Sequence, residues 1–130
     1  MLAIQWHDGL NVGLEFMDHD HAEAAALINE MASATGEARA AALERFIAHC
    51  REHFAREEAM MGKIGFFALG CHQGEHERVL AELDGVMTKM RAGEAQDHYF
   101  AKVLPEWLLT HRGTMDAVTA QFARSAGFIG

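Results

Sequence analysis

Hydrophobic residues recur at steps of three and four along most of the chain, and polar residues fill the positions between them. This period is that of an amphipathic helix, which turns one apolar face toward a core. Gly36, Gly62 with Gly65, and Gly93 are expected to close the first three helices. The elements that the pattern predicts are an arm at residues 1–17, long helices at 18–35, 37–62, 67–92 and 95–112, and a short helix at 114–124.

Four long helices joined by short connections predict a single all-α domain over residues 1–130. Such helices pack antiparallel, so we expect an up-down-up-down four-helix bundle with an N-terminal arm and a short C-terminal helix. Pro105 should kink the fourth helix unless that helix begins only a residue or so earlier. Gly70 and Gly74 weaken the start of the third helix and indicate either a tight helix contact or a strained start.

Composition and charge narrow the functional classes. The chain has 130 residues, two cysteines and a formal net charge of −8. This acidic balance argues against electrostatic binding of nucleic acid or of an anionic membrane surface. The first residues lack a basic region followed by an apolar run, and no apolar stretch approaches the roughly 20 residues that cross a bilayer. We therefore expect a soluble, cytoplasmic monomer without membrane insertion, and the length leaves no room for an output domain.

The chain has nine histidines, and five of them lie with two carboxylates on the inward faces of the predicted helices. These inward polar residues are His21, His53, Glu57, His72, His76, His111 and Asp116. His53 and Glu57 are four residues apart, as are His72 and His76. This spacing places both side chains of a pair on one helix face, so each pair can reach one site.

His111 and Asp116 are five residues apart. On a regular helix, with about 100° per residue, that spacing leaves the two side chains about 140° out of phase. Gly113 offers a break or a local rewinding that would return Asp116 to the core. We therefore predict a functional irregularity of the helix at residues 112–114.

The inward carboxylates need a buried positive charge, because no lysine or arginine stands at an obvious inward position. Imidazoles with carboxylates are a ligand set for borderline metal ions, and zinc fits less well because its sites use fewer protein ligands. Two octahedral ions bridged by both carboxylates and one oxide or hydroxide would keep a single open position, which suits one small ligand. The same ligand types also suit manganese or a mixed-metal centre, so the identity of the metal is not fixed at this point. A metal-free bundle does not account for so many convergent polar side chains.

The order of these motifs resembles that of the hemerythrin family, in particular its single-domain bacterial members. The motifs are His21, His53-x-x-x-Glu57, His72-x-x-x-His76 and His111-x-x-x-x-Asp116, with Trp6, Asn11-Val12-Gly13, Asp18-His19-Asp20 and Trp107-Leu108 as supporting context. The resemblance covers nearly the whole chain. It implies a non-heme di-iron centre that binds dioxygen reversibly, for oxygen carriage, storage or delivery.

The resemblance also implies a role for each inward residue. One iron would be held by His72, His76 and His111, and the other by His21 and His53. The bridges would be Glu57, Asp116 and an oxo or hydroxo group. Dioxygen would bind at the open position of the iron with two histidines. The candidates for an apolar lining of that position are Phe54, Trp107 and Leu108, each of which is also typical of ordinary core packing.

Two other functions stay open at this point. The same centre could reduce peroxide or nitric oxide, or oxidise ferrous iron, if water and protons reached it. It could also act as an oxygen or iron sensor, whose occupancy changes the state of a partner protein.

The remaining polar and sulfur-containing residues have ordinary interpretations. The histidines expected at the surface are His19, His49 and His98, and His7 in the arm has no assigned partner. The acidic residues Asp18, Asp20 and Glu23 are expected to form a solvated helix start rather than a surface metal site. Both cysteines, Cys50 and Cys71, are expected to be small buried core residues. We expect Arg112 to point outward rather than to lie at the mouth of the bundle, where it would affect solvent access.

Overall fold

The computed structural model describes residues 2–128 of the chain, and every regular element within them is a helix. The elements are the 3₁₀ turn η1 (Asp8–Leu10), α1 (Glu15–Ser33), α2 (Gly36–Ile64), α3 (Leu69–Arg91), the π-helical turn η2 (Tyr99–Val103), α4 (Leu104–His111), the π-helical turn η3 (Arg112–Asp116) and α5 (Ala117–Ser125). None of the helices in this described part is long and apolar enough to span a bilayer.

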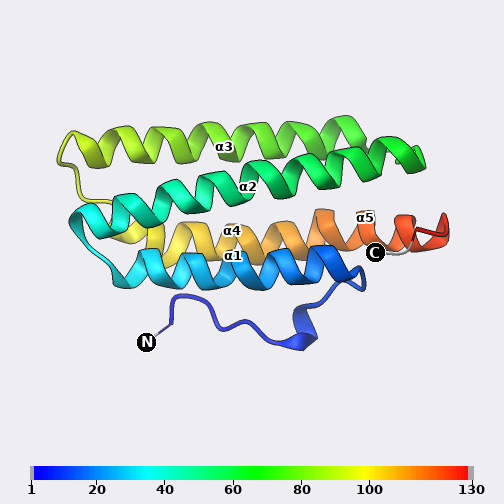
Figure 1. Ribbon diagram of the computed structural model, residues 1–130, viewed down its shortest axis with the longest axis horizontal. Helices are drawn as coiled ribbons and strands as arrows, with labels where there is room; N and C mark the ends of the chain where they lie inside the picture. The colour runs from blue at the N-terminus through cyan, green and yellow to red at the C-terminus, as the bar shows by residue number, and fades with distance from the viewer. Residues whose placement is uncertain (1, 129–130) are drawn as a thin grey trace.

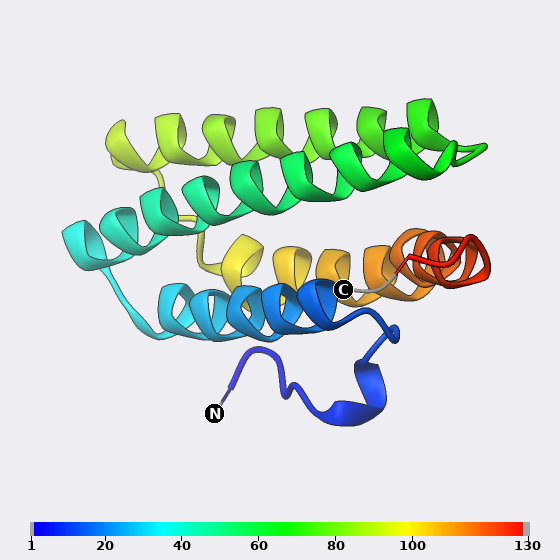
Figure 2. The same ribbon diagram turned by 45° about the vertical axis from the view of Figure 1, so that its right-hand side comes forward.

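The helices form four rods along the long axis of the molecule (Figure 1). The fourth rod consists of η2, α4, η3 and α5, which continue one another because the backbone at each junction stays right-handed helical. Successive rods run in opposite directions, with α1 packed against α2 and α4, and α2 against α3 (Figure 2). The antiparallel all-α bundle is therefore confirmed. The N-terminal arm follows the outside of α1 (Figure 1).

Glycines close two of the first three helices as expected. Gly65 caps α2 with a left-handed φ of 67°, and Gly93 follows the end of α3 with a φ of 88°. The expectation for Gly36 is wrong, because α1 already ends at Ser33 and Gly36 is the first residue of α2. At its other end α1 begins at Glu15, which is earlier than the expected residue 18.

The fourth rod departs most from the expected elements. The separate short helix expected after Gly113 is instead joined to the rest of the rod through η3. Pro105 lies in the first turn of α4, inside the continuous rod, and follows the π-helical turn η2, in which the Leu104 N–H donates to the carbonyl of Tyr99, five residues back. At the start of α3, a Cβ on Gly70 or Gly74 would meet no atom of a neighbouring helix within 4 Å, so a tight helix contact does not explain these glycines.

Two apolar clusters fill the bundle, and a polar layer lies between them. The larger cluster includes Ile28, Leu43, Phe46, Leu83, Phe100 and Leu104. The smaller cluster includes Leu14, Met17, Met60, Met61, Phe66 and Ala123. On α2, Glu57 lies between Phe54 of the larger cluster and Met60 of the smaller. Buried polar groups at such a position require specific partners.

The N-terminal arm is tied to α1 at two places. The side-chain amide of Asn29 pairs with Ile4, donating to its carbonyl at 2.8 Å and accepting from its N–H at 2.9 Å. At the other end of the arm, the carboxylate of Asp18 accepts a hydrogen bond from the Val12 N–H at 2.6 Å. These contacts hold the arm against the bundle beside the polar layer, where Trp6 meets the His21 ring edge-on at 6.0 Å between centroids.

Candidate metal centre

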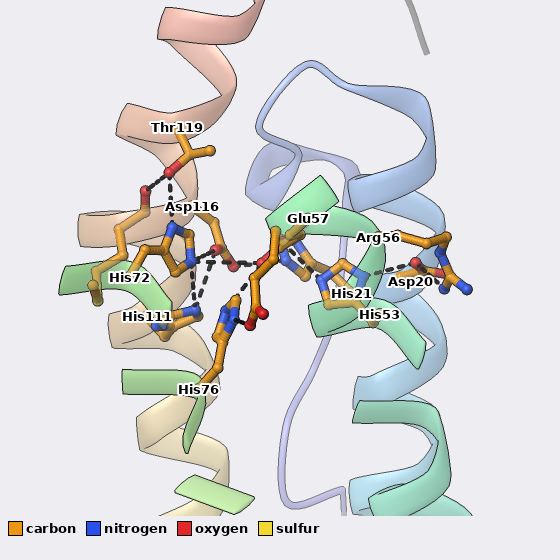
Figure 3. A network of polar contacts seen from close by, with 12 residues as sticks. Asp20, His21, His53, Arg56, Glu57, His72, His76, His111, Asp116 and Thr119 are labelled. Atoms are coloured by element: carbon orange, nitrogen blue, oxygen red, sulfur yellow. Dashed lines mark hydrogen bonds and ion pairs between the residues drawn. The ribbon is translucent and has the colours of Figure 1, made fainter. Parts of the chain in front are cut away.

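All seven predicted side chains meet in the polar layer (Figure 3). The layer receives His21 from α1, His53 and Glu57 from α2, His72 and His76 from α3, and His111 and Asp116 from the fourth rod. Each of these residues exposes 5% of its surface or less. The pairs on α2 and α3 enter the layer together because residues four apart lie one above the other on a helix.

The histidines form two groups of unequal size (Figure 3). On one side, the ring of His72 lies 4.5 Å from that of His76 and 5.0 Å from that of His111 between centroids. On the other side, the rings of His21 and His53 are 5.4 Å apart. The layer therefore offers three imidazoles on one side and two on the other.

Asp116 lies between these two groups. Its Oδ2 is 2.8 Å from Nε2 of His21, whereas its Oδ1 is 3.0 Å from Nε2 of His72 and 3.2 Å from Nε2 of His111. The π-helical turn η3 makes this possible, because the Ala117 N–H donates to a carbonyl five residues back instead of four. A local rewinding at this place was predicted, and the extra residue in the turn returns Asp116 to the face of His111.

Glu57 joins the two groups in the same way. Its Oε2 is 2.9 Å from Nε2 of His53, and its Oε1 is 3.1 Å from Nε2 of His76 and 3.5 Å from Nε2 of His72. The side chain is completely buried. Each of the two carboxylates thus turns one oxygen toward the group of three histidines and the other toward the group of two.

Carboxylates outside the layer hold two of the rings. The Nδ1–H of His53 donates to Asp20 at 2.7 Å, and the Nδ1–H of His76 donates to Glu58 at 2.9 Å. An ionised carboxylate only accepts hydrogen bonds, so it fixes the tautomer of each ring with the hydrogen on Nδ1. The lone pair of Nε2 in both rings then points into the layer.

A hydroxyl group holds a third ring in the same tautomer. Thr119 Oγ1 donates its proton to the carbonyl of Met115 at 2.9 Å, so it can only accept from Nδ1 of His72, also at 2.9 Å. The hydrogen of His72 therefore lies on Nδ1, and the Nε2 lone pair faces the layer. Only 3.2 Å separates that Nε2 from Nε2 of His111.

Lone pairs consequently face one another at the centre of the layer. Among the described residues, Nε2 of His53 and of His76, both oxygens of Glu57 and Oδ1 of Asp116 are buried without a hydrogen-bond partner. Groups that only accept repel one another at these separations unless a cation lies between them. Imidazole nitrogen and carboxylate oxygen are ligands that borderline first-row ions prefer. The cluster is therefore able to hold a metal, and its donors are consistent with iron.

Protons can take the place of metal ions in this layer. Burial opposes ionisation of Glu57 and Asp116, but the facing histidines outweigh it and hold the pKa of both carboxyls below the usual range. Burial also disfavours the charged form of His53, yet the charge of Glu57 and the hydrogen bond to Asp20 raise its pKa to about 10. Burial likewise disfavours the charged form of His111, but the hydrogen bond to the Asp116 carboxylate and its charge raise the pKa of His111. Metal binding must then displace protons.

A small cavity adjoins the side with two histidines. Its volume is about 20 Å³, and its lining includes both histidines of the smaller group, His21 and His53, but only His111 of the larger group. The apolar and sulfur-containing part of its wall consists of Ala24, Phe46, Cys50, Phe54, Trp107 and Leu108. This wall contains the three residues proposed from the sequence as an apolar lining. A space of this size accepts one molecule about as large as water.

Two aromatic side chains pack flat on imidazoles of the larger group. The Phe54 ring lies parallel to that of His76 at 3.8 Å between centroids. The Trp107 ring stacks on that of His111 at 4.8 Å, and its Nε1–H donates to Glu75 at 2.7 Å. Both aromatic rings therefore restrict the orientation of a histidine in the layer as well as closing the cavity.

Two residues lie deeper than the sequence interpretation placed them. Asp20 was expected in a solvated helix start, which is wrong, because it exposes only 6% of its surface. Although burial opposes its ionisation, hydrogen bonds from His53 and Arg56 hold the pKa of Asp20 well below its usual range. His49 was expected at the surface, but only 10% of its side chain is exposed. Burial lowers the pKa of His49, whose Nε2 lies 3.1 Å from the backbone carbonyl of Asp20.

Three further expectations can be compared with the structure. Cys50 is buried as expected, and burial raises the pKa of its thiol. Cys71, which precedes His72 on α3, is exposed, so its expected place in the core is wrong. Arg112 does not simply point outward, because its guanidinium donates to the carbonyl of Leu10 in the arm at 3.1 Å.

Replacing Asp20 by asparagine should weaken metal binding without unfolding the bundle. The amide keeps the shape of the carboxylate but loses the charge that holds the Nδ1–H of His53. Loss of such an outer partner lowers metal affinity by about ten- to a hundredfold. Competition with a chromophoric chelator measures the change. The matched control is Asp84→Asn, which alters a carboxylate that is 58% exposed on α3. Equal affinities of the Asp20→Asn variant and the parent would contradict the role of Asp20.

The fold and the layer together define a metal-binding four-helix bundle with ligands from every rod. The family model described as Hemerythrin HHE cation binding domain matches residues 12–123. A bacteriohemerythrin of Ralstonia nicotianae is 35% identical over 98% of this chain and 93% of its own length. Another, of Stenotrophomonas maltophilia, is 30% identical over 100% of this chain and 95% of its own length. This chain belongs to the hemerythrin family.

Solved structures agree at the level of the fold. The crystal structure of wild-type hemerythrin superimposes with a TM-score of 0.84, at 23% sequence identity, over 92% of this chain and 97% of that one. A point mutant of hemerythrin reaches a TM-score of 0.86 at 22% identity, over 95% of this chain and 98% of that one. The arrangement of rods that carries the layer is thus shared with proteins of little overall sequence similarity.

Proposed function

We propose that this chain binds dioxygen reversibly at two iron ions held in the polar layer. The observation that carries the proposal is the asymmetry of the layer, in which two carboxylates are shared by three histidines on one side and two on the other. An ion with fewer histidines keeps an open position, and the small cavity adjoins that side. When bound, two ferrous ions supply the two electrons that dioxygen takes up on binding and returns on release.

The proposed ligands follow from the two groups. One ion is held by His72, His76 and His111, and the other by His21 and His53. The carboxylates of Glu57 and Asp116 would be shared by the two ions, since each places one oxygen toward each group. The name bacteriohemerythrin of two relatives supports the proposed function at the level of the family.

The residues around the cavity would keep water and protons away from the open position. Ala24, Phe46, Phe54, Trp107 and Leu108 supply the hydrocarbon and aromatic part of the wall, and the raised pKa of the Cys50 thiol keeps that side chain neutral. A volume of about 20 Å³ has room for a diatomic molecule but not for a bulky substrate. Exclusion of water from such a site suppresses side reactions of the bound ligand. The chain itself therefore supplies binding and protection rather than an acid or base.

Metal content and the optical spectrum test this proposal on one sample. We expect two irons per chain by elemental analysis. After reduction with dithionite, a visible band should appear in air and fade reversibly under vacuum. Two irons that oxidise at once to a stable ferric form would overturn reversible binding and favour a redox enzyme or a sensor. Absence of iron, or a preference for manganese, would overturn the iron assignment.

Shortening Leu108 should speed the loss of the oxygenated form. Leu108 exposes 3% of its surface and forms part of the cavity wall. The Leu108→Ala variant enlarges the cavity and admits water, at a cost of about 2–5 kcal/mol in the free energy of unfolding. The decay of the visible band in air measures the effect, and Leu109→Ala, at a neighbouring position that is 38% exposed, is the control. Identical decay rates would show that the wall does not protect the site.

A further inference from the structure

Five imidazoles meet in the polar layer, and two of them have no hydrogen-bond partner at Nδ1. The partners of the other three rings are Asp20, Glu58 and Thr119. Nδ1 of His21 and Nδ1 of His111 are buried and make no hydrogen bond to any described residue. A ligand ring is normally oriented through a hydrogen bond from its outer nitrogen. His21 and His111 therefore need another means of orientation.

The chain has two tryptophans, and each of them contacts one of these two rings. Trp6 of the arm meets His21 edge-on. The indole of Trp107 packs flat on His111, at 4.8 Å between centroids and with 14° between the planes. Stacked rings stay in this contact only while their planes remain nearly parallel. The orientation of His111 thus follows that of Trp107.

Glu75, on α3, holds the indole of Trp107. The Nε1–H of Trp107 donates to Oε2 of Glu75 at 2.7 Å. This N–H is the one polar group of the tryptophan side chain, and a hydrogen bond to a charged acceptor is stronger than one to a neutral acceptor. The carboxylate therefore fixes how the indole is turned about its side-chain bonds.

Arg78 fixes the carboxylate of Glu75 in turn. Its Nε donates to Oε1 of Glu75 at 2.7 Å, and its Nη2 donates to Oε2 at 3.0 Å. A guanidinium that engages both oxygens sets the plane of the carboxylate. The same guanidinium donates from Nη1 to Glu82 at 3.2 Å, and Glu82 accepts from the hydroxyl of Tyr99 at 2.9 Å. One line of charged side chains along α3 thus holds two aromatic side chains of the fourth rod.

The exposure of this ion pair favours a role in orientation over a role in stability. About half of the Arg78 side chain, 51%, is exposed, and 24% of the Glu75 side chain. Exposed ion pairs between residues three or four apart on a helix contribute little to the free energy of unfolding. The geometry of the pair is nevertheless specific, because both oxygens of Glu75 are engaged and one of them receives the indole N–H.

We infer that Glu75, held by Arg78, is a positioning residue for His111 and acts through Trp107. The inference deepens the proposed function, since it rests on His111 as a ligand of one metal ion. It does not require that dioxygen be the molecule bound at the other ion. Within the group of three histidines, His111 is the ring without a hydrogen-bond partner at Nδ1, so it is the ring whose direction depends on a side chain at the surface.

Ring-current shifts test the hold on His111 in the metal-free protein. Flat stacking on an indole moves the NMR signals of the His111 ring protons upfield. The Glu75→Ala variant should lose this upfield shift, and its Trp107 indole N–H should exchange faster with solvent. The Trp6 indole signal should stay unchanged. Glu75→Gln keeps an acceptor oxygen for the indole and should restore most of the shift. The matched control is Glu77→Ala, which removes an exposed carboxylate from the same helix.

Cobalt(II) affinity tests the consequence for the metal centre. In competition with a chromophoric chelator, Glu75→Ala should bind cobalt about tenfold more weakly than the parent, as expected for loss of an outer partner of a ligand. Glu75→Gln should lie close to the parent, and Glu77→Ala should equal it.

Two results would overturn the inference. One is an unchanged His111 ring shift in the Glu75→Ala variant. The other is parent-like cobalt affinity in a variant that has lost the shift, because the ring contact would then not position a ligand. A parent that binds cobalt but does not bind dioxygen reversibly would overturn the proposed function alone.

Discussion

The Glu57→Gln variant should retain at most one metal ion per chain, whereas the parent should retain two. Glu57 places one oxygen 2.9 Å from Nε2 of His53 and the other 3.1 Å from Nε2 of His76. An amide offers one acceptor oxygen, and its NH₂ group would donate to one of these imidazole lone pairs. One histidine group would then be satisfied without a metal ion. The substitution conserves shape, so the bundle should still fold.

Elemental analysis after iron loading and gel filtration measures this effect, and far-UV circular dichroism confirms the fold. The control is Glu52→Gln, which changes an exposed carboxylate on the same helix and should leave the metal content unchanged. Retention of two irons by the Glu57→Gln variant would exclude a bridging role for Glu57. Loss of helix signal would instead mean that the carboxylate is needed for folding, and Glu57→Asp would then separate the two effects.

The metal-free protein should be most stable in mildly acidic solution. The pKa of His53 is raised from 6.5 to about 10, so its contribution is complete below 6.5 and is lost as the pH rises through 10. The pKa of Glu57 is lowered from 4.5, so its contribution is present above that value and is lost as the pH falls. The free energy of unfolding should therefore be greatest between pH 4.5 and pH 6.5, the ordinary pKa values of Glu57 and His53. The loss between neutral pH and 10 should be on the order of a few kcal/mol.

Urea unfolding of chelated protein across this pH range measures the dependence. The metal-loaded protein is the control, because metal ions rather than protons then occupy the imidazole lone pairs. Its stability should vary much less between neutral and alkaline pH, and should fall in acid as protons displace the metal. A free energy of unfolding that does not change with pH in the chelated protein would contradict the charged pairs described for the layer.

Local spacing explains why the side chains that meet in the polar layer could be predicted from the sequence. Residues four apart share a helix face whatever the helix packs against, so His53 with Glu57 and His72 with His76 follow from helical geometry alone. Asp116 is a harder case, because its position depends on the π-helical turn. The spacing of five after His111 indicated that a rewinding was needed, but it did not show that the helix would continue through Gly113.

The outer partners of the histidines could not be found in this way. Asp20 adjoins His21 in the sequence, and consecutive residues on a helix are about 100° apart, which places Asp20 off the inward face. It is buried because α1 also packs against α2 along its side, where His53 and Arg56 meet it. His49 is buried at the same seam. A residue at the flank of a helix, such as Asp20 or His49, is buried only if the neighbouring helix comes close enough to cover it. A single sequence does not give the distance between two helices.

The polar layer affects whether the two ends of the bundle unfold together or separately. It interrupts the hydrophobic core, so the smaller apolar cluster, with Met17 and Met60, is joined to the larger one mainly through the layer. Ions bound there would cross-link all four rods and make the two ends of the bundle unfold as one unit. Without them, the end that carries α5 can open by itself, since local openings follow the weakest boundary of a core. Metal content would then determine how long the chain survives proteolysis.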